Sequence, residues 1–75
     1  MNSLGVVLSN IRESIGMSLN EVQSLTGIDT SYLSRIETGK RIPTKKQIEI
    51  LASTYKCNER MLMDYRDSEK IISEL

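Results

Sequence analysis

Residues 18–38 read SLNEVQSLTGIDTSYLSRIET. Ser18, followed three residues later by Glu21, has the pattern of a capping box, so we expect a helix to begin there. Gly27 is expected to end this helix, because glycine readily adopts the left-handed conformation that closes one. Asp29 then caps a second helix of about two turns. The link between the two helices is too short for antiparallel packing, so the sequence predicts a steep crossing.

Further helices are expected on both sides of this pair. Apolar residues recur at helical spacing before it, at Leu4, Val7, Leu8, Ile11 and Ile15. Thr44 with Gln47 is a second capping box and begins a fourth helix. Asn58 is expected to cap a short fifth helix, and residues 66–75 to form a separate helical tail. The expected fold class is all-α: one compact five-helix domain over residues 1–75, with a short C-terminal helical tail.

The composition excludes most catalytic and metal-binding classes. The chain has 75 residues, one cysteine and no histidine. A disulfide framework and a Cys/His zinc site are therefore excluded, and the usual general base of a nucleophilic enzyme is missing. No stretch approaches the roughly 20 apolar residues of a membrane span, and the N-terminus does not resemble a secretory signal. We expect a cytoplasmic binding domain without enzymatic activity, cofactor, metal or small-molecule ligand.

The charges are unevenly distributed. Ten basic and ten acidic residues give a net charge of zero, but residues 35–46 contain five basic residues and one acidic residue. The flanking segments, 1–34 and 47–75, are each negative by two. Two of the basic residues, Lys45 and Lys46, stand in the first turn of a predicted helix, where they oppose the helix dipole. This arrangement favours a patch that faces an anion such as phosphate over an ordinary solvated turn.

A polar stripe is predicted on the helix that follows Asp29. At about 100° per residue, Leu33 and Ile36 share one side of that helix. The opposite side then carries the polar residues Thr30, Ser31, Ser34, Arg35 and Thr38. Short hydroxyl side chains allow a helix to approach the major groove of DNA closely, and an arginine can donate two bonds to a guanine edge. The alternative is a solvent-facing stripe in which Arg35 pairs with Glu37 or another acid.

Several motifs resemble one known family. They are Gly16-Met17-Ser18, Glu21-Val22, Thr26-Gly27-Ile28, the run from Ser31 to Glu37 (SYLSRIE) and Gly39-Lys40-Arg41-Ile42-Pro43. Together they resemble the Cro and phage-repressor (XRE) type of helix-turn-helix regulator, over about residues 4–65. The resemblance implies a lambda-repressor-like domain that binds double-stranded operator DNA, usually as a homodimer. The second helix of the motif, at about residues 30–38, would enter the major groove.

The resemblance also implies roles for single residues. Base-reading or groove positions are matched by Thr30, Ser31, Ser34 and Arg35. Phosphate-facing positions are matched by Tyr32, Lys40, Arg41, Lys45 and Lys46. Arg12 and Glu37 match a structural ion pair. Three residues depart from the pattern. Leu19 stands where a phosphate-clamping glutamine is common, so that contact comes from Asn20 or the backbone or is absent. Gln23 replaces a small residue where the two motif helices approach, and Asp29, at the start of the second helix, would repel phosphate.

The resemblance predicts a sequence-specific transcriptional regulator such as a repressor. The size of the chain favours a controller protein of a restriction-modification system. The alternative is an antitoxin or other protein-interaction module whose main partner is a protein. Apolar residues near the C-terminus fit either a core or a homodimer interface: Met61, Leu62, Tyr65, Ile71, Ile72 and Leu75.

Overall fold

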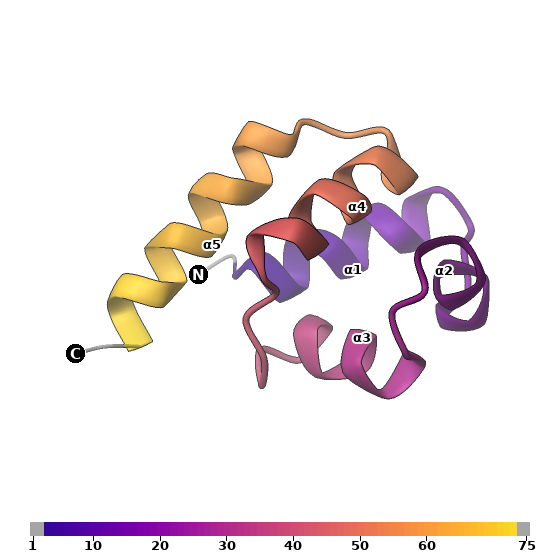
Figure 1. Cartoon of the computed structure of the whole chain (residues 1–75), viewed down its shortest axis with the longest axis horizontal. Coiled ribbons are helices and arrows are strands. Elements are labelled where there is room, and N and C mark those ends of the chain that lie inside the picture. The colour runs from indigo at the N-terminus through magenta and orange to yellow at the C-terminus, as the bar shows by residue number, and fades with distance from the viewer. Residues whose placement is uncertain (1–2, 74–75) are drawn as a thin grey trace.

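The computed structural model describes the backbone of residues 3–73 and the side chains of residues 3–69. It contains five helices: α1 (Leu4–Ser14), α2 (Leu19–Thr26), α3 (Thr30–Glu37), α4 (Lys45–Tyr55) and α5 (Glu59–Ser73). No strand occurs in the described part of the chain, and the all-α fold class is confirmed. In Figure 1, α3 lies along the lower edge of the molecule, α2 lies at the right, and α5 extends to the left.

The helix starts follow the capping patterns in the sequence. Ser18 Oγ accepts from the Glu21 amide at 3.1 Å, and Glu21 Oε1 accepts from the Ser18 amide at 3.0 Å. Thr44 and Gln47 form the same reciprocal pair at 3.1 and 2.9 Å. Each box satisfies amides that the first helical turn would otherwise leave without partners. At the other end of α2, Gly27 has a φ of 78°, in the left-handed region that glycine tolerates best.

The C-terminal region differs from the sequence-based expectation. In place of a short fifth helix and a separate tail from residue 66, α5 runs without a break over 15 residues. Residues 59–73 contain neither glycine nor proline, so nothing in them interrupts the helical hydrogen bonds. Side chains of the second half also bond to the rest of the fold. Glu69 Oε1 accepts from the Leu4 amide at 3.0 Å, at the start of α1.

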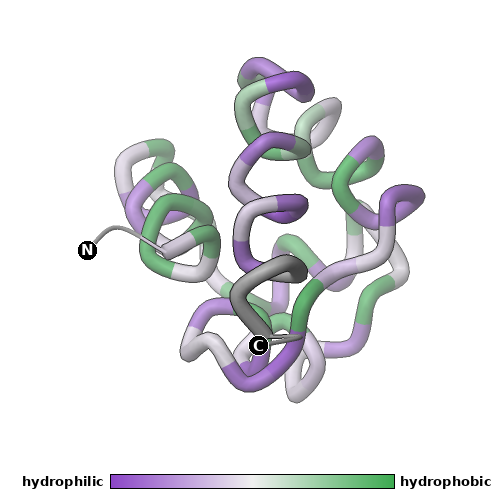
Figure 2. The backbone as a smooth tube through the Cα atoms, turned by 90° about the vertical axis from the view of Figure 1, so that its left-hand side faces the viewer, coloured by the Kyte–Doolittle hydropathy of each residue, from purple (hydrophilic) through white to green (hydrophobic). Residues whose placement is uncertain are grey.

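Each helix contributes to one aliphatic core. The buried apolar residues are Leu4, Leu8, Val22, Ile28, Leu33, Ile36, Ile48, Leu51, Ala52, Tyr55 and Leu62. Figure 2 shows hydrophobic and hydrophilic residues alternating along the helices, as expected for helices that turn one side inward. Within this arrangement α3 packs on α1 and α2, while α4 packs on α2 and α5. The outer side of α3 is thereby left free of other helices.

Gly5 sets the closest approach between α1 and α3. A Cβ atom at this position would lie 2.5 Å from the Ile36 carbonyl oxygen and 2.6 Å from that of Glu37. Both distances are far below van der Waals contact, and both neighbours are backbone atoms that cannot move aside as a flexible side chain can. Glycine therefore allows the C-terminal end of α3 to rest directly on the first turn of α1.

Candidate nucleic-acid interface

The rotation of α3 about its axis is fixed by two buried residues. Leu33 and Ile36 are each 2% exposed and face the core. The polar residues of the stripe consequently lie on the outer side: Ser31, Ser34, Arg35 and Thr38 are exposed, and Thr30 is half-buried. Thr38 follows the last helical residue and forms the C-cap of α3. The structure thus presents one continuous polar surface along α3.

The start of α3 is held by two side-chain acceptors. Asp29 Oδ2 accepts from the Ser31 amide at 3.0 Å and also from the Ser31 hydroxyl. These bonds from Ser31 lower the pKa of the exposed Asp29 carboxyl. Gln23 Oε1, on α2, accepts from the Thr30 amide at 2.8 Å. The hydroxyl proton of Ser31 is therefore already engaged within the protein, which leaves its oxygen to act as an acceptor toward a ligand.

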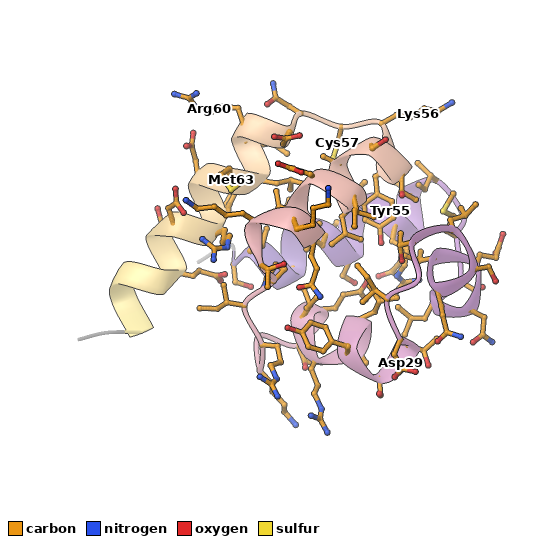
Figure 3. All side chains as sticks on the ribbon, in the orientation of Figure 1. Asp29, Tyr55, Lys56, Cys57, Arg60 and Met63 are labelled. Atoms are coloured by element: carbon orange, nitrogen blue, oxygen red, sulfur yellow. The ribbon has the colours of Figure 1, made fainter. Side chains whose placement is uncertain are left out.

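Gln23 has a role that the sequence did not reveal. It stands where the resemblance implies a small residue between the motif helices, yet its side chain is exposed rather than wedged between them. Its carboxamide reaches across the turn and caps the first residue of α3. The hydrogen-bonding capacity of glutamine was the available signal, but its partner is a backbone amide seven residues away. Asp29, labelled in Figure 3, lies in the link between these two helices.

The end of α3 leads directly into the basic turn. Arg35 O accepts from the Lys40 amide at 2.8 Å and from the Arg41 amide at 3.2 Å. The Thr38 hydroxyl also donates backward, to Ser34 O at 3.0 Å. Gly39 makes this tight reversal possible with a φ of 81°. The basic residues Lys40 and Arg41 are thus placed immediately beside the C-terminal end of the polar surface.

The basic cluster consists of residues on the turn and on the first helical turn of α4: Lys40, Arg41, Lys45 and Lys46. All four side chains are exposed. The Arg41 guanidinium carbon lies 5.6 Å from the centre of the Tyr32 ring, within the range of a cation–π contact. Lys46 Nζ lies 3.8 Å from Glu49 Oε2, but both side chains are at least half exposed, so this pair contributes little.

Glu37, the one acid within residues 35–46, does not neutralise this cluster. Its carboxylate accepts two bonds from Arg12 on α1, from Nε to Oε2 at 2.7 Å and from Nη2 to Oε1 at 3.0 Å. Arg12 Nη1 also donates to the Met17 carbonyl at 2.7 Å. The hydrogen bond to Glu37 is the main cause that raises the pKa of Arg12. Among residues with described side chains, Arg35 forms no ion pair, so the alternative pairing of Arg35 with Glu37 does not occur.

Asn20 and Leu19 lie in the first turn of α2. Leu19 packs against the core, and Asn20 is exposed. Of these two residues, Asn20 is the one whose side chain is accessible for the phosphate contact suggested by the resemblance.

The apolar residues of α5 divide between the core and the surface. Leu62 is fully buried in the core. Of the two alternatives for this residue, the core is therefore correct and a place in the dimer interface is wrong. Met61 is 37% exposed and Tyr65 is half-buried. With Asp64 and Ser68 they line an open hollow of about 310 Å³. The side chains of Ile71 and Ile72 lie outside the described part, as does Leu75 entirely.

Neither a metal centre nor a membrane span emerges from the described residues. Over this part of the chain, no group of three His, Cys, Asp or Glu side chains is placed to hold a metal ion. None of the helices described is long and apolar enough to cross a bilayer.

Comparison with known proteins shows the family to which this chain belongs. A family model described as helix-turn-helix matches residues 8–62. The chain belongs to the helix-turn-helix family. The matched segment extends from α1 through the first turn of α5, and the members of this XRE-type family are DNA-binding regulators. No curated protein matches the chain. Both α2 and α3 lie within the matched segment.

Proposed function

We propose that this helix-turn-helix domain is a sequence-specific transcriptional regulator that reads operator DNA with α3 in the major groove. The observation that carries the proposal is the outer surface of α3. Exposed polar side chains lie beside the basic cluster, and Glu37, the one acid within residues 35–46, is bound to Arg12. Among residues with described side chains, Arg35 forms no ion pair. Phosphate contacts position such a domain on DNA, and base contacts provide specificity.

Base readout is assigned to the outer side of α3. Arg35 is exposed, and its planar fork matches the two acceptors of a guanine edge. Ser34 and Thr30 are short enough to lie near base edges, and Ser31 would contribute as an acceptor because its proton is bound by Asp29. Thr38, at the C-cap, is assigned to the edge of the groove because its hydroxyl already donates to the α3 backbone.

Phosphate contact is assigned to the basic cluster, with Tyr32 and Asn20 as neutral donors. Lys40 and Arg41 follow α3 directly, and Lys45 and Lys46 open α4, so one stretch of backbone presents all four charges. The cation–π contact with Tyr32 limits the conformations of Arg41. Each contact of this kind releases counterions from DNA, so binding should weaken steeply as salt is added.

We propose a homodimer that binds two half-sites. The exposed side of α5, with Met61 and Tyr65 around the open hollow, supports a second copy as its occupant. A two-fold dimer with half-sites one helical turn apart, about 34 Å, would place both α3 helices on the same face of the DNA. The hollow equally fits the alternative function, in which a different protein docks on α5. The restriction-modification controller subtype, repression as the mode of action and the cytoplasmic location stay predictions from the sequence.

The test is binding to duplexes selected from a random pool. The randomised segment would be about 30 base pairs, enough for two half-sites. Fluorescence anisotropy then compares a selected duplex with its scrambled version at about 50 and 200 mM salt. A regulator binds the selected duplex much more tightly and loses affinity with salt. If no sequence is enriched and a protein partner is captured instead, the protein-interaction function replaces this proposal. Sedimentation with and without DNA gives the oligomeric state.

A further inference from the structure

Arg66 connects α5 to the turn between α3 and α4. Its Nε donates to the Pro43 carbonyl oxygen at 2.7 Å, and its Nη1 lies 3.3 Å from Asp67 Oδ1. The side chain is 11% exposed, so this arginine is nearly buried. A buried guanidinium is retained only where its donors meet good acceptors, because desolvation of the charge is costly. The short bond to Pro43 is therefore the interaction that keeps Arg66 in this position.

Pro43 lies in the middle of the basic cluster. It is a fully buried residue that follows Arg41 by two positions and precedes the α4 N-cap Thr44. The beginning of the turn is held by Arg35 O, which accepts from the Lys40 and Arg41 amides. Its end is held by the capping box of Thr44. The bond from Arg66 holds the point between these two anchors, and it comes from a helix 23 residues further along the chain.

Arg66 also lies outside the part of the chain that matches the family. The matched segment ends at residue 62, one turn of α5 before Arg66. Glu69, in the same second half of α5, accepts from the Leu4 amide and so fastens this stretch to the start of α1. The second half of α5 is thus bonded both to α1 and to the turn that carries the basic residues.

We propose that Arg66 is a positioning residue for phosphate contact: it fixes the turn at Pro43 so that the cationic side chains on either side are held where α3 meets the DNA backbone. The inference rests on the proposed function, because the positioned residues are those assigned to phosphate. It adds that the segment of α5 beyond the family match is required for the DNA-binding surface. Arg66 itself touches no DNA in this arrangement, since its guanidinium faces the Pro43 carbonyl in the interior.

The test compares Arg66→Met with Arg60→Met. Arg60 is on the same helix, its side chain is 88% exposed, and it lies at the edge of the molecule opposite α3 (Figure 3), so its variant controls for the loss of one positive charge. Asp67→Asn is the second control, because it weakens the longer contact and leaves the bond to Pro43. Arg66→Lys keeps the charge and one donor, and should restore most of the wild-type behaviour.

Two measurements are made at a temperature where circular dichroism shows each variant folded. The first is the rate of tryptic cleavage after Lys40 and Arg41, which needs no DNA. We expect Arg66→Met to increase this rate about tenfold, because loss of the hydrogen bond from a charged donor to Pro43 makes local opening of the turn about that much more frequent. Both controls should leave the rate unchanged. The second is affinity for a random-sequence duplex against salt concentration. We expect the slope of log affinity against log salt concentration to decrease by about one in Arg66→Met and to stay unchanged in the controls.

The outcomes separate this inference from the proposed function. Wild-type cleavage at Lys40 and Arg41 in folded Arg66→Met, or a salt slope equal to that of Arg60→Met, would overturn the positioning role. If Arg66→Met does not fold, Arg66→Ala replaces it, because alanine also removes the donor and leaves room for water to satisfy the Pro43 carbonyl. Wild-type cleavage in that variant overturns the role equally. A wild-type protein that binds no duplex would instead remove the proposed function, whatever the cleavage rates.

Discussion

Arg12 and Glu37 join the first and third helices through two parallel hydrogen bonds, although they are 25 residues apart in the chain. Their side chains are 15% and 11% exposed, so water has limited access to the pair. Both Glu37 oxygens are used, and the third bond of Arg12 reaches Met17 at the start of the motif. The Arg12 guanidinium thus fixes α3 relative to α1. Because both Glu37 oxygens are bound to Arg12, Glu37 does not pair with Arg35.

Arg12→Met should reduce the free energy of unfolding by about 2–4 kcal/mol, because it leaves the Glu37 carboxylate largely buried without its partner. The double variant Arg12→Met/Glu37→Leu should recover part of this loss, since it removes the isolated charge as well. Urea denaturation followed by circular dichroism measures both. A single variant as stable as the wild type would contradict the structural role of the pair.

Gly5→Ala should destabilise the fold by about 1–3 kcal/mol, the usual range for overpacking between rigid groups. Alanine would otherwise stabilise a helix by about 1 kcal/mol relative to glycine, so the sign of the effect reports the contact with the α3 carbonyls. Asn10→Ala, at an exposed site on the same helix, is the control and should be neutral or slightly stabilising. Thermal unfolding distinguishes the two. Equal stabilisation in both variants would contradict the close contact between Gly5 and the α3 carbonyl oxygens.

Arg35→Ala should lose about 1–3 kcal/mol of binding to a selected duplex and relax the preference at one base position. The physical reason is the loss of a two-bond contact to a guanine edge. Repeating the random-pool selection with the variant measures the preference directly. Arg60→Ala, on the far side of the molecule, should behave like the wild type. An Arg35→Ala protein with unchanged affinity and preference would remove this residue from the readout.

Lys45→Ala should weaken binding to selected and scrambled duplexes by similar factors and reduce the salt slope by about one. Lys45 is exposed at the start of α4 and, in the part of the chain with described side chains, forms no ion pair, so its removal should cost little stability. Anisotropy titrations over a range of salt concentrations give the slope. A loss confined to the selected duplex would argue against phosphate contact.

Stability should decrease in alkaline solution because of Tyr55. Burial raises the pKa of Tyr55 from 10.0 to about 12, so the folded state favours the neutral phenol. This contribution is fully present below pH 10, where the phenol is neutral in both states, and is lost as the pH rises toward about 12. A rise of this size in the pKa corresponds to a contribution of roughly 2–3 kcal/mol to the free energy of unfolding. Urea midpoints for wild type and Tyr55→Phe should converge or cross over this interval, and parallel curves would show that Tyr55 is not responsible.

The features that were predictable from the sequence are local ones. Both capping boxes pair residues three positions apart, so donor and acceptor are close whenever a helix begins there. The outer face of α3 was also predictable, because Leu33 and Ile36 alone determine which side turns inward. The exposure of the basic cluster follows from the same rule, since charged side chains without a buried partner stay in water.

The features that were missed depend on distant backbone atoms. Arg66 bonds to a carbonyl 23 residues earlier, and the acceptor at Gln23 meets an amide across a turn. Gly5 was unremarkable in the sequence because the α3 carbonyls above it become neighbours only after folding. Leu62 was grouped with Met61 as fitting either the core or an interface, although adjacent residues on a helix face directions about 100° apart. No periodicity in one segment encodes such contacts, because each requires the relative positions of two helices.

The bond between Gln23 and the first amide of α3 holds α2 and α3 together at the turn, so a partner that contacts both helices is bound through two linked contacts. If DNA is bound as proposed, with a phosphate on α2 and base edges on α3, each contact raises the effective concentration for the other, because the bond limits motion between the two helices. Part of the affinity would therefore belong to the linkage rather than to either contact. In a chain with alanine at position 23, each contact would have to form with less help from the other.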